Sequence, residues 1–393
     1  PIFTCYLCAR TPFSAASHPC NTVHNANRYM KIGFVAEPYE ESGASGMGYM
    51  ILELLKNLPI VGKKHEFTIN SSVSIRKDLV LVPIRNIIVP KSFLGKFLWF
   101  LRTDEDIDVL LFVTPLLPLI LPRRIKAIPI FPEVVSQKIV PGTLHDKFVA
   151  FVRDHVLMPI CLSRAVKLIT ISHATKDDII TYYKILPNDI TVIYVGFQNL
   201  SSYKNKTPVV EDRIKPYFFF TGRVKPRKNV HAIVSAFIQF KKRTHTDCKL
   251  VIAGKAGGDY YESMLKELTK NGLQNDVFFV GYVSPESLCS YYVHALAFVF
   301  PSLNEGFGMP VVEAMNLGTP VITSSISSLP EAAGDAGLLV DPYDIGDISH
   351  AMEEIFTDSG LRAKLIEKGY VQAKKFSWEK TAREYLSVIE GIV

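Results

Sequence analysis

The fold is decided by the stretch Phe300-Pro-Ser-Leu-Asn-Glu305-Gly306-Phe307-Gly308-Met-Pro-Val-Val-Glu313-Ala-Met315. It predicts a strand, a Gly-Phe-Gly turn and a helix that begins directly after the turn. Glycines let the backbone approach a ligand closely, and the free N–H groups at a helix start attract an anion. With Glu305 before the helix and Glu313 inside it, the stretch suits a ligand that is both phosphorylated and polyhydroxylated. The alternative is a Gly-rich connection with two solvated glutamates.

A second motif ends an aromatic strand and runs Tyr217-Phe-Phe-Phe-Thr-Gly222-Arg223-Val-Lys225-Pro-Arg227-Lys228-Asn-Val230. Its four cations precede a helix expected from about 229 to 243. Cations at the carboxyl end of a strand suit a diphosphate, because a guanidinium can bind two oxygens at once and an ammonium acts as a point charge. A solvated basic turn is the alternative.

Together the two motifs resemble the retaining glycosyltransferases of the GT-B fold, family 4, also called glycosyl transferases group 1. That family carries a Gly-Arg-x4-Lys-Asn signature and a Glu-x7-Glu signature in this order. The resemblance covers nearly everything from about Met30 to the C-terminus and is most specific in the second half. It implies an α/β fold of two Rossmann-like domains that face an interdomain cleft.

The resemblance also assigns roles to residues. Arg223 and Lys228 would hold the donor diphosphate, and Glu305 the hydroxyls of the donor sugar, so these three are the expected catalytic residues. Glu313 would bind the ribose of the nucleotide. The other expected donor-binding residues are Gly46, Gly48, Gly222, Val283, Gly306, Phe307 and Gly308.

The first half offers weaker signals. Glu41-Ser-Gly-Ala-Ser-Gly46-Met-Gly48-Tyr49 is a Gly-rich loop ahead of a helix expected over 49–57, and in similar enzymes this loop faces the donor phosphates. A flexible turn explains the loop about as well. Ile169-Thr-Ile-Ser172-His-Ala-Thr175 resembles the family's strand and capped helix, and we expect Ser172 or Thr175 to act only as the helix cap.

One position departs from the family pattern. Many relatives carry a His-Asp pair at the end of a first-domain strand, and the sequence match places Ile128 and Pro129 there. Either another group replaces the pair, with His145-Asp146 or Glu133 as candidates, or the chain is catalytically altered. The second option leaves open a non-catalytic GT-B subunit that binds nucleotide sugar without turnover. A sugar-phosphate phosphorylase or a nucleotide-sugar epimerase on the same fold is a third hypothesis.

The length of 393 residues fits two domains of roughly 180 residues each rather than one core. We expect an acceptor domain over 30–200, a nucleotide-sugar donor domain over 201–375, and a C-terminal helix within 376–393 that, by the resemblance, crosses back to the first domain. Apolar runs that alternate with helical patterns predict mainly parallel sheets. The expected strands lie near 31–35, 65–70, 86–89, 108–113, 126–130, 167–172 and 190–195, then 217–221, 249–254, 276–280, 296–300, 320–323 and 337–340.

The charge is uneven along the chain. Residues 1–200 hold 22 basic and 16 acidic residues, whereas residues 201–393 hold 22 of each. A basic acceptor domain would attract an anionic partner such as a lipid diphosphate or a membrane surface, although unevenly spread solvated lysines are the alternative. No stretch reaches the roughly 18 apolar residues of a membrane span. Residues 91–102 are the candidate for peripheral membrane contact, with a buried core helix as the alternative.

Residues 1–29 differ from the rest of the chain. Cys5-x-x-Cys8 with His18, Cys20 and His24 invites a zinc hypothesis, but we expect a non-native or disordered extension there. The other cysteines are Cys161, Cys248 and Cys289, which lie among apolar neighbours and predict buried thiols. We therefore expect a cytoplasmic protein that contacts the inner face of the membrane at most peripherally, with no nucleic acid as partner.

The resemblance implies a mechanism as well. A sugar leaves a nucleoside diphosphate and joins a glycan, lipid-linked or small-molecule acceptor on the same face, so that the anomeric configuration is retained. The charge on the leaving diphosphate is then stabilised by the cations and the helix start, without a metal or a cofactor. Asp104-Glu-Asp106 has the spacing of a metal motif, but its polar surroundings indicate a solvated linker.

Overall fold

The computed structural model describes residues 29–36, 46–72, 84–90, 106–113, 117–118, 121–122, 124–134, 151–152, 157–206 and 210–392. Several sequence predictions fall outside these ranges. They concern the cysteines and histidines of residues 1–28, the segment 91–102, the first two residues of the acidic triplet at 104–106, and His145 with Asp146.

The first domain is built on a seven-stranded parallel sheet in the order β3-β2-β1-β4-β5-β6-β7. All seven strands lie where the sequence predicts them. The strands β4, β5 and β6 are almost completely buried, as expected for a parallel sheet, whereas Ile88 of the edge strand is exposed. The strands are β1 (Lys31–Val35), β2 (Glu66–Ser71), β3 (Arg85–Ile88), β4 (Val109–Phe112), β5 (Lys126–Phe131), β6 (Leu168–Thr170) and β7 (Ile190–Val192).

The second domain has a six-stranded parallel sheet in the order β10-β9-β8-β11-β12-β13. The central strand β8 is fully buried from Tyr217 to Phe220, because it lies between two strands and beneath helices on both faces. These strands also match the predicted ranges. They are β8 (Tyr217–Thr221), β9 (Lys249–Ala253), β10 (Val277–Gly281), β11 (Ala297–Phe300), β12 (Val321–Ser324) and β13 (Gly337–Val340).

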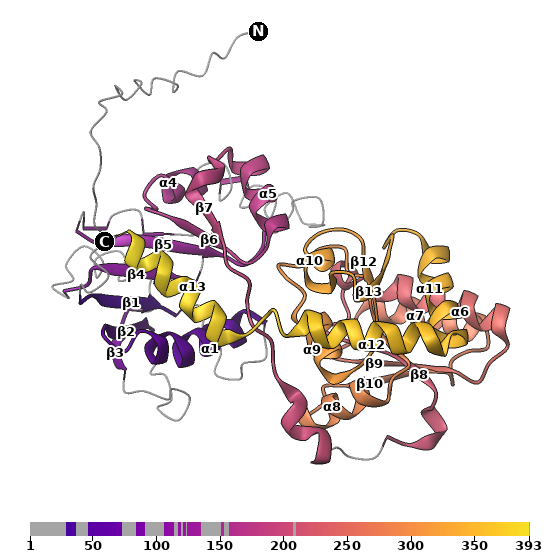
Figure 1. Cartoon of the computed structure of the whole chain (residues 1–393). Coiled ribbons are helices and arrows are strands. Elements are labelled where there is room, and N and C mark those ends of the chain that lie inside the picture. The colour runs from indigo at the N-terminus through magenta and orange to yellow at the C-terminus, as the bar shows by residue number, and fades with distance from the viewer. Residues whose placement is uncertain are drawn as a thin grey trace, which may run out of the picture.

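The helices complete two Rossmann-like α/β units (Figure 1). The first unit carries α1 (Gly46–Val61), α4 (Met158–Leu162) and α5 (His173–Tyr183). The second carries α6 (Val230–Thr244), α7 (Asp259–Lys270), α8 (Pro285–His294), α9 (Met309–Leu317), α10 (Leu329–Ala333), α11 (Ile345–Thr357) and α12 (Ser359–Ala373). None of the described helices is long and apolar enough to cross a membrane.

The chain passes between the two units twice, and the two passages touch. The outward passage follows β7 and continues into a short 3-10 helix, Leu200–Lys206; the return passage leads from α12 to α13 (Trp378–Gly391). A Cβ added to Gly196 would lie 2.5 Å from the backbone nitrogen of Trp378, so the two passages lie in contact there. Helix α13 then packs along α1 of the first unit (Figure 1).

Two local predictions were wrong. Helix α1 begins at Gly46, three residues before the predicted start, so Gly46 and Gly48 form its first turn and not a loop. Burial of Gly48, Met50 and Ile51 on the core face outweighs the low helix propensity of glycine. Ile128 lies fully buried in the middle of β5, not at the strand end where the family's His-Asp pair was sought. Glu133 lies two residues beyond the end of this strand.

Candidate functional site at the second switch point

The two sequence motifs meet at the point where the second sheet reverses its strand order. Strands β8 and β11 are direct neighbours. After β8 the chain continues to β9 on one side of this pair, and after β11 it continues to β12 on the other side. In open α/β sheets, ligands bind outside the carboxyl ends of the strands at such a switch point. The basic motif follows the end of β8 at Thr221, and the Gly-Phe-Gly motif follows the end of β11 at Phe300.

Contacts with backbone carbonyl groups connect the two motifs. The Leu303 N–H donates to the Arg227 carbonyl at 2.9 Å, and the Ser302 hydroxyl oxygen lies 3.0 Å from the same carbonyl oxygen. The Asn229 side-chain amide donates to the Pro301 carbonyl at 3.1 Å. The site is therefore a single rigid edge formed by both loops.

Lys228 and Glu305 form an ion pair at the centre of this edge. Lys228 Nζ lies 2.6 Å from Glu305 Oε1 and 4.9 Å from the centre of the Phe300 ring. The Ser302 hydroxyl donates to the same carboxylate oxygen at 2.5 Å. Both charged side chains are largely buried, so each is held in a fixed position by the other. The structure thus joins two of the three predicted catalytic residues directly.

The third, Arg223, lies just after β8 and is exposed to solvent. Within the described part of the chain it forms no ion pair or side-chain hydrogen bond, and the same is true of the exposed Lys225 and Lys255 nearby. Val224 and Lys255 are linked by a backbone hydrogen bond of 3.1 Å, which brings the loops after β8 and β9 together. Three cations are therefore available to an anion at this edge.

The Gly-Phe-Gly turn lies against the first domain. A Cβ at Gly306 would come within 2.1 Å of the Pro132 carbonyl oxygen, so only glycine allows this approach. Gly308 has a φ of 109° and is the residue that precedes α9. Pro310 has no N–H and the Val311 N–H donates to the Gly308 carbonyl at 2.9 Å, so the N–H groups of Gly308 and Met309 are the ones that present the positive end of α9 to the site.

Glu313 lies on α9, behind the turn. It is 8% exposed, and its carboxylate accepts a hydrogen bond of 3.3 Å from the fully buried Tyr292 hydroxyl. Burial raises the pKa of Glu313 to about 7, although a backbone hydrogen bond from Gln198 and the one from Tyr292 oppose this shift. The carboxylate is therefore poised to change its charge near neutral pH.

The remaining predicted residues lie around this edge. Gly46 lies across from α9, since a Cβ there would be 3.2 Å from the Met309 methyl group. Gly222 follows β8 directly, and Val283 lies two residues beyond the end of β10. Gly48 is buried in the first turn of α1.

Two cross-domain contacts were not predicted as such. Arg227 Nη1 lies 2.5 Å from Glu133 Oε2 of the first domain and 3.1 Å from the Asn304 carbonyl. Glu331 of α10 binds the start of α5 in the first domain. Glu133 is a candidate from the sequence, but its pairing with Arg227 of the other domain leaves no spacing pattern in the sequence that reveals it.

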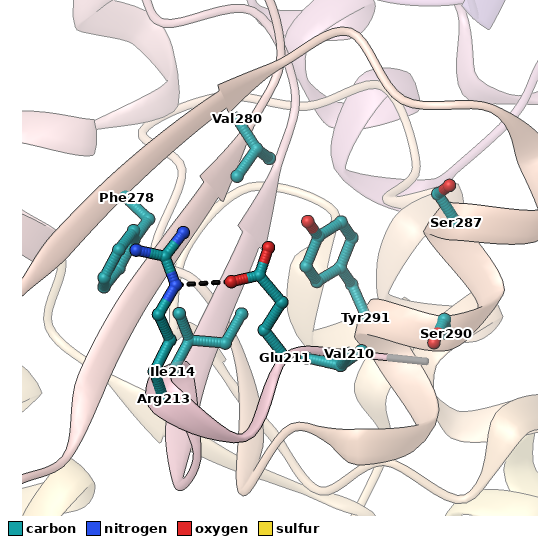
Figure 2. Close-up of a pocket in the computed structure, with 9 residues that line it drawn as sticks. All are labelled: Val210, Glu211, Arg213, Ile214, Phe278, Val280, Ser287, Ser290 and Tyr291. Atoms are coloured by element: carbon teal, nitrogen blue, oxygen red, sulfur yellow. Dashed lines mark hydrogen bonds and ion pairs between the residues drawn. The ribbon is translucent and has the colours of Figure 1, made fainter. Parts of the chain in front are cut away.

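The cavity drawn in Figure 2 lies apart from these residues. It measures about 190 Å³ and lies between the segment 210–214, strand β10 and helix α8, with an Arg213–Glu211 ion pair at its wall. Its described lining contains no predicted donor residue. The lining residues are Val210, Glu211, Arg213, Ile214, Phe278, Val280, Ser287, Ser290 and Tyr291.

Comparison with known proteins identifies the family of the second domain. Residues 203–372 match the family model "Glycosyl transferases group 1". O-antigen chain mannosyltransferase B of Escherichia coli is 36% identical over 172 residues, which is 44% of this chain and 45% of that protein. O-antigen chain mannosyltransferase RfbU of Salmonella typhimurium is 32% identical over 53% of this chain and 56% of its own length. The chain thus spans about half the length of these curated relatives.

Solved structures with low sequence identity share the whole fold. Sucrose-phosphate synthase from Thermosynechococcus elongatus matches with a TM-score of 0.71 and 18% identity, over 92% of this chain and 99% of its own. Anabaena Alr3699/HepE, solved in complex with UDP and glucose, matches with a TM-score of 0.71 and 16% identity, over 92% and 100%. Residues 203–372 therefore carry a glycosyl transferases group 1 domain, and the chain as a whole has the fold of GT-B glycosyltransferases.

Proposed function

We propose that the protein transfers a sugar from a nucleoside-diphosphate sugar to a hydroxyl acceptor and retains the anomeric configuration. The observation that supports this most is the Lys228–Glu305 pair of 2.6 Å at the switch point. In this pair, the cation proposed for the phosphate and the carboxylate proposed for the sugar hydroxyls lie side by side, at the same edge as the exposed Arg223 and the start of α9. Glu313 behind the turn is the proposed ligand of the ribose.

In the proposed reaction, the bond between the anomeric carbon and the phosphate oxygen breaks while the acceptor oxygen bonds to the same face of that carbon. The departing phosphate oxygen takes the acceptor proton, so no protein nucleophile is required. Arg223, Lys228 and the N–H groups of Phe307 and Gly308 stabilise the charge that grows on the diphosphate. Such electrostatic stabilisation is usually the largest contribution to catalysis. The proposal includes no metal and no cofactor.

The relatives direct the choice of substrates. Because two of them are named O-antigen chain mannosyltransferases, mannose is the first sugar to test, with a glycan or lipid-linked acceptor. The basic first half of the chain fits an anionic acceptor and a peripheral contact with the inner face of the cytoplasmic membrane. The transferase names of the relatives also favour turnover over the non-catalytic subunit.

The test uses the full chain with mannose, glucose and galactose donors carried on UDP, GDP and ADP. We expect one donor to release its nucleoside diphosphate, faster when an acceptor glycan is added. Proton NMR of the new glycosidic linkage should show the anomeric configuration of the donor. Release from none of the donors would contradict the proposed transfer, and an inverted linkage would contradict retention alone.

A further inference from the structure

Glu331 of the second domain caps a helix of the first domain. One of its carboxylate oxygens accepts the N–H of Ala174 at 2.8 Å, and the other accepts the N–H of His173 at 2.8 Å and the hydroxyl of Tyr194 at 2.9 Å. His173 and Ala174 are the first two residues of α5. N–H groups at this position have no helical partner, and a carboxylate there also interacts favourably with the helix dipole.

The segment that carries Glu331 also supports the donor turn. Just before α10, the Ser327 hydroxyl accepts the N–H of Glu305 at 3.1 Å, and the Ser328 hydroxyl donates to the Glu305 carbonyl at 2.8 Å. Leu329 lies so close to Gly308 that a Cβ there would be 2.7 Å from its methyl group. The start of α10 therefore contacts both ends of the turn that runs from Glu305 to Gly308.

Tyr194, which donates to Glu331, also contacts the donor turn. Its ring centre lies 5.6 Å from that of Phe307, in the middle of the turn, and 5.5 Å from that of Phe376. Phe307 and Phe376 are themselves 5.0 Å apart. Tyr194 belongs to the outward passage between the domains and Phe376 to the return passage. Burial, and then the hydrogen bond to Glu331, raise the pKa of Tyr194, so its hydroxyl remains a donor.

We propose that Glu331 is a positioning residue for the transfer reaction, because its contact with α5 couples the docked first domain to the shape of the Glu305–Gly308 turn. This inference rests on the proposed function for its catalytic consequence. Without the carboxylate, α10 loses its hydrogen bonds to α5 and Tyr194, so the side of the donor turn that packs on α10 loses this link to the first domain, while Gly306 still lies against Pro132. Glu331 itself touches neither the predicted diphosphate ligands nor Glu305 among the described contacts.

Amide hydrogen exchange tests the coupling without any need for activity. Glu331→Gln keeps the side-chain shape but turns an amide NH₂ toward one of the N–H donors. We expect exchange at His173 and Ala174 to accelerate by about tenfold or more, the scale of a lost charge-assisted hydrogen bond. Exchange at Glu305 and Phe307 should accelerate as well. Tyr194→Phe, which keeps the ring contacts, should produce a smaller change at the same places.

Glu354→Gln is the matched control. It also removes one negative charge from a helix of the second domain, but Glu354 is exposed and its side chain has no partner among the described residues. We expect wild-type exchange in this variant. In turnover assays, Glu331→Gln should lower kcat by roughly 10- to 100-fold, the effect of a misplaced reacting group. The dissociation constant of the nucleoside diphosphate should stay within about threefold of wild type.

The outcomes separate this inference from the proposed function. Faster exchange at His173 and Ala174 with an unchanged turn and unchanged kcat would make Glu331 a local helix cap and overturn the coupling. Unchanged exchange at both places would mean that the contact does not form in solution. If the wild-type chain turns over no donor, the proposed transfer fails, while the exchange comparison still decides whether the turn depends on Glu331.

Discussion

At the residue scale, the site combines an exposed cation, Arg223, a cation in an ion pair, Lys228, and a buried acid, Glu313. Arg223 is exposed and available, whereas Lys228 is held by Glu305 before any ligand is bound. Burial raises the pKa of Glu313, because water no longer stabilises its charged form. These differences lead to two predictions about Glu313.

Glu313→Gln should weaken nucleoside-diphosphate binding while the fold is kept. Loss of a charged acceptor for a ribose hydroxyl costs roughly 1.5–3 kcal/mol, about 10- to 150-fold in the dissociation constant. Calorimetry at pH 8, where the wild-type carboxylate is ionised, measures this change. Glu354→Gln again serves as the control, and an affinity equal to wild type in Glu313→Gln would remove Glu313 from the site.

Glu313 should also make the ligand-free protein less stable as the pH rises. Because its folded-state pKa is about 7 and its usual value is 4.5, the folded protein binds the proton more tightly than the unfolded chain. The resulting stability is complete below 4.5 and is lost as the pH rises through 7, up to about 3 kcal/mol. The melting temperature of wild type should therefore fall relative to Glu313→Gln between pH 6 and 8. A constant difference would contradict this assignment.

At the element scale, the described strands were predictable because most of them are short apolar runs that are buried in the sheets; the edge strand β3, with Arg85 and Ile88 exposed, is buried least. The strand ends then brought Arg223, Lys228 and Glu305 to one edge, since β8 and β11 are neighbours. Helix α1 was misjudged at its start because core burial of its first turn is not visible in a Gly-rich sequence. The contact of Glu331 with His173 and Ala174 of α5 was not predictable, because these residues come together only through the arrangement of the two domains.

The turn between β11 and α9 gives the prediction at this scale. Gly306→Ala should lower kcat/KM by roughly a hundredfold, because its Cβ would lie 2.1 Å from the Pro132 carbonyl and push the turn away from the first domain. Gly391→Ala in α13 meets no atom within 4 Å and is the control. Steady-state kinetics with the donor that the nucleotide-sugar panel selects measure this change. Wild-type kinetics in Gly306→Ala would show that the close approach of the two domains is not needed for turnover.

At the scale of the whole molecule, two Rossmann-like units place one charged edge against the end of β5. Arg227 and Glu133 bridge the units at 2.5 Å, near the Lys228–Glu305 pair. In this arrangement, cations of the second domain surround the position proposed for the diphosphate. We propose that these cations, rather than a metal, stabilise the leaving group.

The most direct test is the turnover of the double variant Arg223→Ala/Lys228→Ala, assayed with EDTA present. We predict that kcat falls by more than about a hundredfold, at least 3 kcal/mol, and falls by a larger factor than KM rises, because the lost interaction strengthens in the transition state. Lys266→Ala/Lys270→Ala removes the same charge from exposed positions of α7, away from this edge, and should retain most activity. Near-normal kcat in the first variant would contradict the proposed role of Arg223 and Lys228. Loss of wild-type activity in EDTA with recovery on addition of manganese would contradict leaving-group stabilisation without a metal.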